Sequence, residues 1–192
     1  MSVPKIAVII SSTRDTRFAD KPAKYLMELA QKRTDAIFEI VDLRDFHLPF
    51  FNEVASNLWA PTQDPKGQQW QKKIAEYDGY IFLVAEYNHS ITAALKNAMD
   101  FAYPEWNHKA AAFFGYGSVG GARAVEHLRM ICIELQLHPT RNAVHIGGSD
   151  FFGVWQQGKA IEDLPNISNS VTTMIDELIW WTSALKTARI KA

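Results

Sequence analysis

The chain has one cysteine, no long apolar run and almost no net charge, and each shortage excludes a class of protein. Cys132 alone cannot form an internal disulfide or a cysteine-rich metal site, and its place in an apolar helical pattern predicts a buried core residue. No stretch approaches the roughly 20 apolar residues that cross a bilayer, so no membrane span is expected. The formal net charge of −1 leaves no basic surplus that would attract nucleic acid or anionic lipid.

The sequence also lacks the short motifs of several enzyme classes. There is no GxxxxGK[ST] phosphate loop, no GxSxG hydrolase elbow, and no glycine between residues 11 and 17 for a dinucleotide fingerprint. Glu86 and His89 have no partner at metal-ligand spacing, so no metal is expected. The N-terminus lacks the charged-then-apolar pattern of a signal peptide, which makes a reducing, cytoplasmic location the default expectation.

What is present is ordinary for a soluble globular protein of 192 residues, of which 47% are hydrophobic and 21% charged. That length can bury one sizeable core and is short for two full domains. No repeat, low-complexity tract or linker interrupts the chain, so residues 1–192 are expected to form a single domain.

Apolar segments that are typical of strands alternate with helical patterns. Strands are predicted over residues 5–10, 37–43, 80–84, 110–114 and 142–146. Helices are predicted over 18–29 and 67–77, from residue 90 or 91, behind residue 121, and over 170–188, with loops at 44–66 and 147–168. This alternation predicts an α/β fold, a doubly wound parallel sheet of strand order 2-1-3-4-5 with helices on both faces. The loops after strands one, three and four then meet at the switch point, where ligands bind in such sheets.

The first of these loops, residues 11–17, is rich in hydroxyl and guanidinium groups and precedes a helix. Helix N-termini, hydroxyls and arginine all suit a phosphate group. A helix cap flanked by solvated arginines is the alternative interpretation.

The second loop, residues 85–90, follows a strand that reads as buried on both faces. Its backbone amides and Tyr87 could receive a flat heteroaromatic ring, whereas the alternative is an ordinary turn in which Ser90 caps the next helix. A hydrolase site built from His89, Ser90 and Asp100 is disfavoured because adjacent side chains point in different directions.

The third loop, residues 115–121, has four glycines around Ser118. Glycine lets the backbone approach a ligand closely and adopt positive φ, although a tight turn before a helix would also use it.

In these three loops the chain resembles the NADPH-dependent FMN reductase family, flavodoxin-like proteins that include quinone, azo-dye and chromate reductases. The family's phosphate loop maps onto Ser12, Arg14 and Arg17, and its proline-glutamate-tyrosine-asparagine motif falls on residues 85–88. The glycine-tyrosine-glycine-serine-x-glycine-glycine motif falls on residues 115–121. The chain departs from the family pattern where Ser11 replaces a glycine and Ala85 replaces a proline, so weaker flavin binding is expected.

The resemblance implies an FMN-dependent oxidoreductase that passes hydride from NADPH or NADH to a quinone, azo compound or similar small-molecule acceptor. Because the cofactor carries this chemistry, no catalytic side chain is expected. The residues expected to bind FMN are Ser12, Thr13, Arg14, Arg17, Ala85, Glu86, Tyr87, Asn88, Gly117, Ser118 and Gly120.

Two other functions stay open from the sequence: a flavin reductase that uses FMN as a diffusing substrate, and a non-catalytic flavin-binding redox sensor. The resemblance also implies a homodimer or homotetramer. Interface candidates are the 46–51 segment, Trp59, Tyr103, Trp106 and the Trp180–Trp181 pair, and core packing is the alternative for each, favoured for the tryptophan pair.

Overall fold

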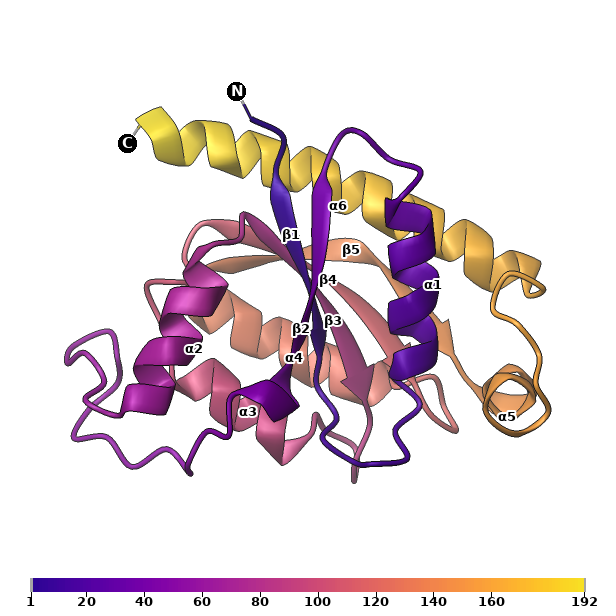
Figure 1. Cartoon of the computed structure of the whole chain (residues 1–192), viewed down its shortest axis with the longest axis horizontal. Coiled ribbons are helices and arrows are strands. Elements are labelled where there is room, and N and C mark those ends of the chain that lie inside the picture. Colours follow the sequence, from indigo (N-terminus) through magenta and orange to yellow (C-terminus); the bar gives the residue numbers. More distant parts are fainter. Residues whose placement is uncertain (1, 192) are drawn as a thin grey trace.

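Five parallel strands form the centre of the protein (Figure 1). Figure 1 shows the computed structural model, which describes residues 2–191. The strands are β1 (Lys5–Ile10), β2 (Ile37–Asp42), β3 (Gly79–Ala85), β4 (Lys109–Tyr116) and β5 (Leu137–Ile146). Their order is β2-β1-β3-β4-β5, which confirms the order predicted from the alternation of strands and helices.

Six α-helices cover the two faces of the sheet (Figure 1). They are α1 (Asp20–Ala30), α2 (Pro65–Ala75), α3 (Ala93–Asp100), α4 (Ala122–Glu134), α5 (Gly148–Gln156) and α6 (Pro165–Lys191), and a short 3-10 helix spans Leu43–Asp45. Apolar residues of α2, α3 and α4 pack in one core, and those of α1, α5 and α6 pack in another. The sheet separates the two cores because successive strand side chains point to opposite faces.

The central strands are buried because helices cover both of their sides. All seven residues of β3 and all eight of β4 are buried, whereas β2, at the edge of the sheet, is only partly buried. A continuous apolar run is the pattern that such two-sided burial requires, which is why the sequence located these strands correctly. Cys132 is buried as predicted, and burial raises the pKa of its thiol.

Some element ends differ from the sequence expectation. The helix expected from residue 90 or 91 begins at Ala93, because the Thr92 hydroxyl, and not Ser90, accepts the Leu95 N–H at 3.1 Å. The helix expected at 67–77 begins two residues earlier, where Asp64 caps it. The strand expected at 142–146 extends back to Leu137, and its register with β4 shifts between Ala111 and Phe113.

The loop expected at 147–168 is wrong in two places. Helix α5 occupies Gly148–Gln156, and α6 begins at Pro165. Glycines at 148 and 153 interrupt the apolar spacing of α5, so its periodicity is weak in the sequence. Phe151 and Val154 are nevertheless buried against the sheet.

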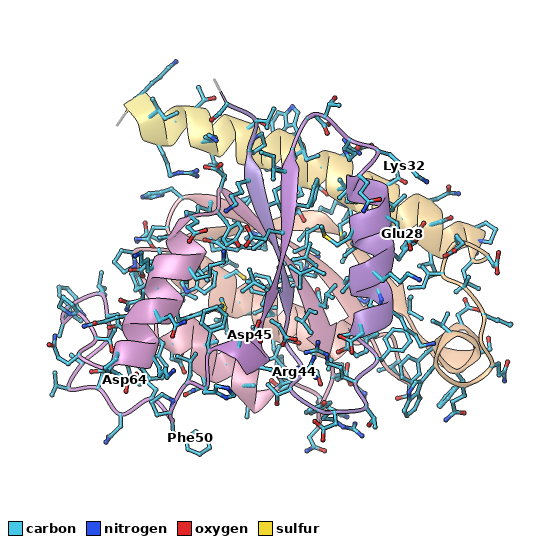
Figure 2. The ribbon with its side chains drawn as sticks, viewed as in Figure 1. Glu28, Lys32, Arg44, Asp45, Phe50 and Asp64 are labelled. Atoms are coloured by element: carbon cyan, nitrogen blue, oxygen red, sulfur yellow. The ribbon has the colours of Figure 1, made fainter. Side chains whose placement is uncertain are left out.

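The aromatic residues that were predicted as interface candidates differ in how deeply they are buried. Trp106 is buried in the core and Tyr103 nearly so, whereas Phe50 is 84% exposed and projects from the 44–66 loop (Figure 2). Core packing was favoured for both tryptophans of α6, but Trp180 is 64% exposed, and this expectation was wrong. Trp181 is half-buried and stacks on His138 with ring centroids 4.0 Å apart. None of the helices between residues 2 and 191 is both long and apolar enough to cross a membrane.

Candidate functional site

The carboxyl ends of β1, β3 and β4 bring the three predicted loops together around a cavity of about 230 Å³. Its lining includes Ser12, Arg14, Thr16, Arg17, Ala85, Glu86, Tyr87, Gly117 and Ser118, joined by Phe18, Tyr116, Phe151 and Trp155. Most of the residues predicted to bind a ligand therefore lie together. Thr13, Asn88 and Gly120 are in the same loops but do not line this cavity.

The first two residues of the loop after β1 form hydrogen bonds with β3 and with the loop after it. The Ser11 hydroxyl donates to the Leu83 carbonyl at 2.5 Å, and the Thr92 hydroxyl donates to the Ser11 carbonyl at 2.9 Å. The Ser12 hydroxyl lies 2.9 Å from the Tyr87 hydroxyl. Because the Ser11 side chain is directed toward β3, the serine that replaces the family's glycine does not line the cavity.

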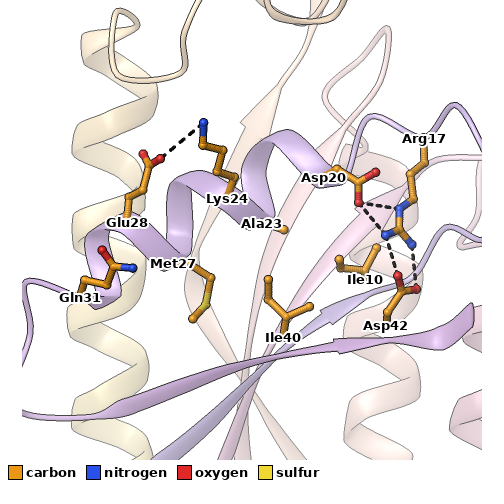
Figure 3. A pocket seen from close by; sticks show the side chains of 10 residues that line it. All are labelled: Ile10, Arg17, Asp20, Ala23, Lys24, Met27, Glu28, Gln31, Ile40 and Asp42. Atoms are coloured by element: carbon orange, nitrogen blue, oxygen red, sulfur yellow. Dashed lines mark hydrogen bonds and ion pairs between the residues drawn. The ribbon is translucent and has the colours of Figure 1, made fainter. Parts of the chain in front are cut away.

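The two arginines of this loop have different surroundings. The Arg17 guanidinium is 3% exposed and donates to Asp42 at 2.8 and 2.6 Å, to Asp20 at 2.8 and 2.6 Å, and to the Ser12 carbonyl at 3.0 Å (Figure 3). Burial alone would raise the pKa of Asp42, but hydrogen bonds from Arg17 and Arg44 lower it to about 2. Arg14 is exposed, and its side chain makes no hydrogen bond within residues 2–191. Arg17 thus braces the loop against β2, and Arg14 is the arginine that is free to meet a ligand.

The loop after β3 forms a tight turn. The Tyr87 N–H donates to the Ser90 carbonyl at 2.9 Å and the Ser90 N–H donates back to the Tyr87 carbonyl at 3.1 Å. Asn88 and His89 have φ values of 51° and 70°, which is the left-handed pair of a type I′ turn. No carbonyl in residues 2–191 takes the N–H of Asn88 or His89, so both amides can meet a ligand.

An ion pair joins this turn to the start of α4. The Arg123 guanidinium pairs with Glu86, whose side chain is 6% exposed, and the Arg123 backbone N–H donates to the same carboxylate at 3.2 Å. The Arg123 Nη1 atom also lies 2.9 Å from His89 Nε2. Sequence reasoning did not place Arg123, because only the folded sheet brings α4 beside the loop after β3.

The glycine-rich loop after β4 requires glycine at its close approaches. Gly121 has φ of 67°, and a Cβ there would lie 2.7 Å from the Tyr116 nitrogen. Gly117 has φ of 137°, and a Cβ there would meet no atom within 4 Å. Gly121 therefore permits close packing, whereas at Gly117 no side chain covers the backbone beside the cavity.

The fourth side of the cavity is aromatic, and the sequence did not predict it. Phe18 lies between Tyr116 and Phe151 with ring centroids 5.0 and 4.9 Å away, and Phe151 contacts Trp155 at 5.3 Å. The Tyr116 hydroxyl is buried and makes no hydrogen bond to any residue from 2 to 191. A buried hydroxyl without such a partner offers hydrogen-bonding capacity that a bound ligand could use. Its burial, with the nearby Tyr87, raises the pKa of the Tyr116 phenol.

Comparison with known proteins assigns this arrangement to a family. The sequence profile of NADPH-dependent FMN reductases matches residues 4–150 of the chain, which is more than half of it. The chain belongs to the NADPH-dependent FMN reductase family. FMN is the cofactor of this family and NAD(P)H its electron donor, so the chain is an oxidoreductase. The aromatic residues of α5 lie beyond the matched residues.

Individual relatives agree with this membership. The chain is 31% identical over 165 residues to an NAD(P)H-dependent FMN reductase of a Nectria species, with 80% of this chain and 82% of that protein covered. It is 37% identical over 142 residues to the NAD(P)H:quinone oxidoreductase of Solanum tuberosum, with 71% of each covered. The NAD(P)H:(acceptor) oxidoreductase FerB of Paracoccus denitrificans has a similar structure, with a TM-score of 0.70 and 24% identity over 95% of this chain and 98% of that one. At that identity the FerB likeness shows the shared fold alone.

The residues of this family member fit the polar end of FMN. A phosphate needs several hydrogen-bond donors, and Arg14, Thr16, Ser118 and the buried Tyr116 hydroxyl offer donors that no described residue uses. Within residues 2–191 no group of three or more histidine, cysteine, aspartate or glutamate side chains is placed to hold a metal ion.

Proposed function

We propose that this protein passes hydride from NAD(P)H through bound FMN to a quinone, an azo compound or a similar small-molecule acceptor. The observation that carries the proposal is the convergence of three loops whose free donors surround one cavity at the switch point of the sheet. The relative from Solanum tuberosum, named for quinone reduction, supports this choice of acceptor.

The loop after β1 would hold the phosphate, with Ser12, the backbone N–H of Thr13, Arg14 and Thr16 as its donors and Arg17 as the brace. Arg14 contributes a guanidinium that has no other partner in the described chain, whereas Arg17 is already neutralised by Asp42 and Asp20. We therefore infer that Arg17 supports FMN binding by fixing the loop, not by touching the phosphate.

The turn after β3 would orient the flavin ring system, together with Ala85 and the loop at Gly117, Ser118 and Gly120. When bound, FMN supplies the hydride-accepting and hydride-donating chemistry. The free amides of Asn88 and His89 would stabilise negative charge at the polar edge of the ring. Glu86, Tyr87 and Arg123 hold that turn in place, and no side chain needs to act as nucleophile or general acid.

We further propose that residues 1–192 form a single flavodoxin-like FMN-binding domain of a cytoplasmic homodimer or homotetramer. Met130 and Ile133 of α4 are 68% and 59% exposed, and Met130 shares a cavity with Ser90 of the turn after β3. Apolar side chains exposed in this way are typical of surfaces that associate.

The visible absorbance of the freshly purified protein, before and after anaerobic NADPH, tests the proposal. We expect a yellow protein whose flavin bands bleach on NADPH and return when a quinone is added. A protein that is colourless and also fails to quench the fluorescence of added FMN would contradict it. Flavin that is reduced but elutes separately in gel filtration would indicate the alternative, in which FMN is a diffusing substrate.

A further inference from the structure

A second and larger cavity, of about 700 Å³, lies on the other side of the loop after β1. Thr13 contributes to it from that loop, next to Ser12 in the first cavity. The remaining lining residues come from the 43–50 segment and the start of α3: Leu43, Arg44, His47, Leu48, Pro49, Phe50, Ala93, Ala94 and Asn97. The FMN-binding prediction includes Thr13 alone of these residues, so the cavity has no assigned role.

One wall of this second cavity is apolar and held in place by the protein. Asn97 accepts a hydrogen bond from the Phe51 N–H at 2.9 Å and donates to the Pro49 carbonyl at 2.7 Å. These bonds fix the backbone on both sides of Phe50 to α3. The Phe50 ring is 84% exposed, so it is not part of the core and is positioned at the mouth of the cavity.

The lining of this cavity also includes an oriented cation, Arg44. Asp42 accepts from Nε and Nη2 of Arg44 at 3.2 and 3.0 Å, and these bonds fix the guanidinium plane. The Arg44 Nη1 atom has no hydrogen-bond partner in residues 2–191. Arg44 and Phe50 both lie toward the bottom of Figure 2, at the carboxyl end of the sheet.

Two further polar groups line this cavity without using their hydrogen-bonding capacity. The hydroxyl of Thr13 and the ring of His47 make no hydrogen bond within the described chain. Together with Arg44 they offer hydrogen-bond donors in a cavity that Leu48 and Phe50 also line. Recognition of a ligand there would combine contact with a flat ring and hydrogen bonds to an anion.

We propose that this cavity binds a flat aromatic ring bearing an anionic group, with Arg44 holding the anion and Phe50 covering the ring. The inference rests on the proposed function, because the two reactants of an FMN oxidoreductase supply such chemistry. One source is the 2′-phosphoadenosine of NADPH, and the other is an acidic quinone or azo acceptor. In either case Arg44 is a specificity-determining residue that favours the charged member of a pair of similar ligands.

Isothermal titration calorimetry on the FMN-loaded protein tests the proposal with two matched pairs of probes. The first pair is 2′,5′-ADP and 5′-AMP, and the second is naphthoquinone-sulfonate and unsubstituted naphthoquinone. We expect Arg44→Met to weaken the anionic member of one pair by about tenfold and to leave its partner nearly unchanged, since a charge-assisted hydrogen bond is lost. A change for 2′,5′-ADP would identify the donor as the source, and a change for the sulfonate would identify the acceptor.

Further variants separate ligand contact from damage to the fold. Arg44→Lys keeps the charge and should restore part of the affinity. Phe50→Ala should weaken binding of both members of the affected pair, whereas Val54→Ala, in the same 44–66 loop at 96% exposure and outside the cavity, should weaken neither. Lys32→Met, just beyond the C-terminal end of α1 (Figure 2), controls for loss of one positive charge.

Wild-type affinities for all four probes in both Arg44→Met and Phe50→Ala would overturn the proposal, as would the absence of any binding to the wild-type protein. The anionic probe of the affected pair should also protect Arg44→Lys from thermal unfolding more than it protects Arg44→Met. Calorimetry requires no turnover, so if the protein held no FMN the proposed function would fail, and the same titrations on the FMN-free protein would still test this cavity.

Discussion

Charged groups at the two ends of the sheet differ in whether they have hydrogen-bond partners within the protein. At the amino end, Asp78 accepts hydrogen bonds from the Lys5 N–H at 3.0 Å, from Lys186 at 2.8 Å and from Arg189 at 2.8 Å. At the carboxyl end, Arg14 has no partner in residues 2–191, and Arg44 has one free nitrogen. The amino end therefore satisfies its charges internally, whereas the carboxyl end leaves donors that a ligand can use.

Backbone strain does not distinguish the two ends, but hydrogen bonding does. Left-handed residues occur at both, with His108 and Gln136 at the amino end and Asn88 and His89 at the carboxyl end. The His108 N–H donates to the Gln136 carbonyl at 2.9 Å, so strain there serves the connection between elements. In the turn after β3 the left-handed pair closes the turn between Tyr87 and Ser90 and leaves the amides of Asn88 and His89 without a partner in residues 2–191, which supports their proposed contact with the flavin.

The largest effect is expected at the amino end. Asp78→Ala leaves two cations and a backbone N–H without their shared acceptor, and its side chain is 17% exposed, so we expect the free energy of unfolding to fall. A loss of about 3 kcal/mol in urea denaturation would match the cost of breaking a largely buried pair. The Kd for FMN should stay within twofold of wild type, and a tenfold change would show that the two ends are coupled. Asp78→Asn, which keeps an acceptor for Lys5, should lose less.

Lys109 makes the stability of the amino end depend on pH. Burial, assisted by Arg189, lowers its pKa to about 8, although Asp78 and Glu105 act in the other direction. The unfolded chain binds this proton more tightly, so protonation favours unfolding. The free energy of unfolding is therefore highest above the ordinary lysine pKa and decreases as the pH falls toward 8. In denaturation experiments, the free energy of unfolding of wild type, relative to that of Lys109→Met, should therefore increase by about 2 kcal/mol from about pH 7 to about pH 10. Parallel pH profiles for the two proteins would contradict this.

At the carboxyl end we expect a substitution to change the affinity for FMN and not the stability of the protein. Arg14→Ala removes a guanidinium without a protein partner, so its melting temperature should match that of wild type. Its Kd for FMN, measured by quenching of flavin fluorescence, should rise by about tenfold through loss of a charge-assisted bond to phosphate. Lys32→Ala is the matched control. Unchanged FMN affinity in Arg14→Ala would remove the phosphate assignment.

The sequence predicted what depends on local pattern and order along the chain. Strands β1, β3 and β4 are continuous apolar runs, and the strand order then places the loops at 11–17, 85–90 and 115–121 on one edge. It could not predict which donors stay free, because that depends on side chains brought together from distant elements. Arg17 and Arg14 are indistinguishable in the sequence, and only the position of Asp42 at the end of β2 separates a braced arginine from a free one.

The Glu86–Arg123 pair sharpens the comparison because, like the pairing of Arg17 with Asp42, it is a satisfied charge pair at the carboxyl end. If it positions the turn at 87–90, Glu86→Gln and Arg123→Met should each weaken FMN binding by only about threefold, since Arg123 is 44% exposed and solvent screens the pair. The double variant should then be no weaker than either single one, because both lose the same interaction. If the two losses of affinity instead multiply in the double variant, Glu86 and Arg123 act on FMN separately, and their ion pair does not position the turn.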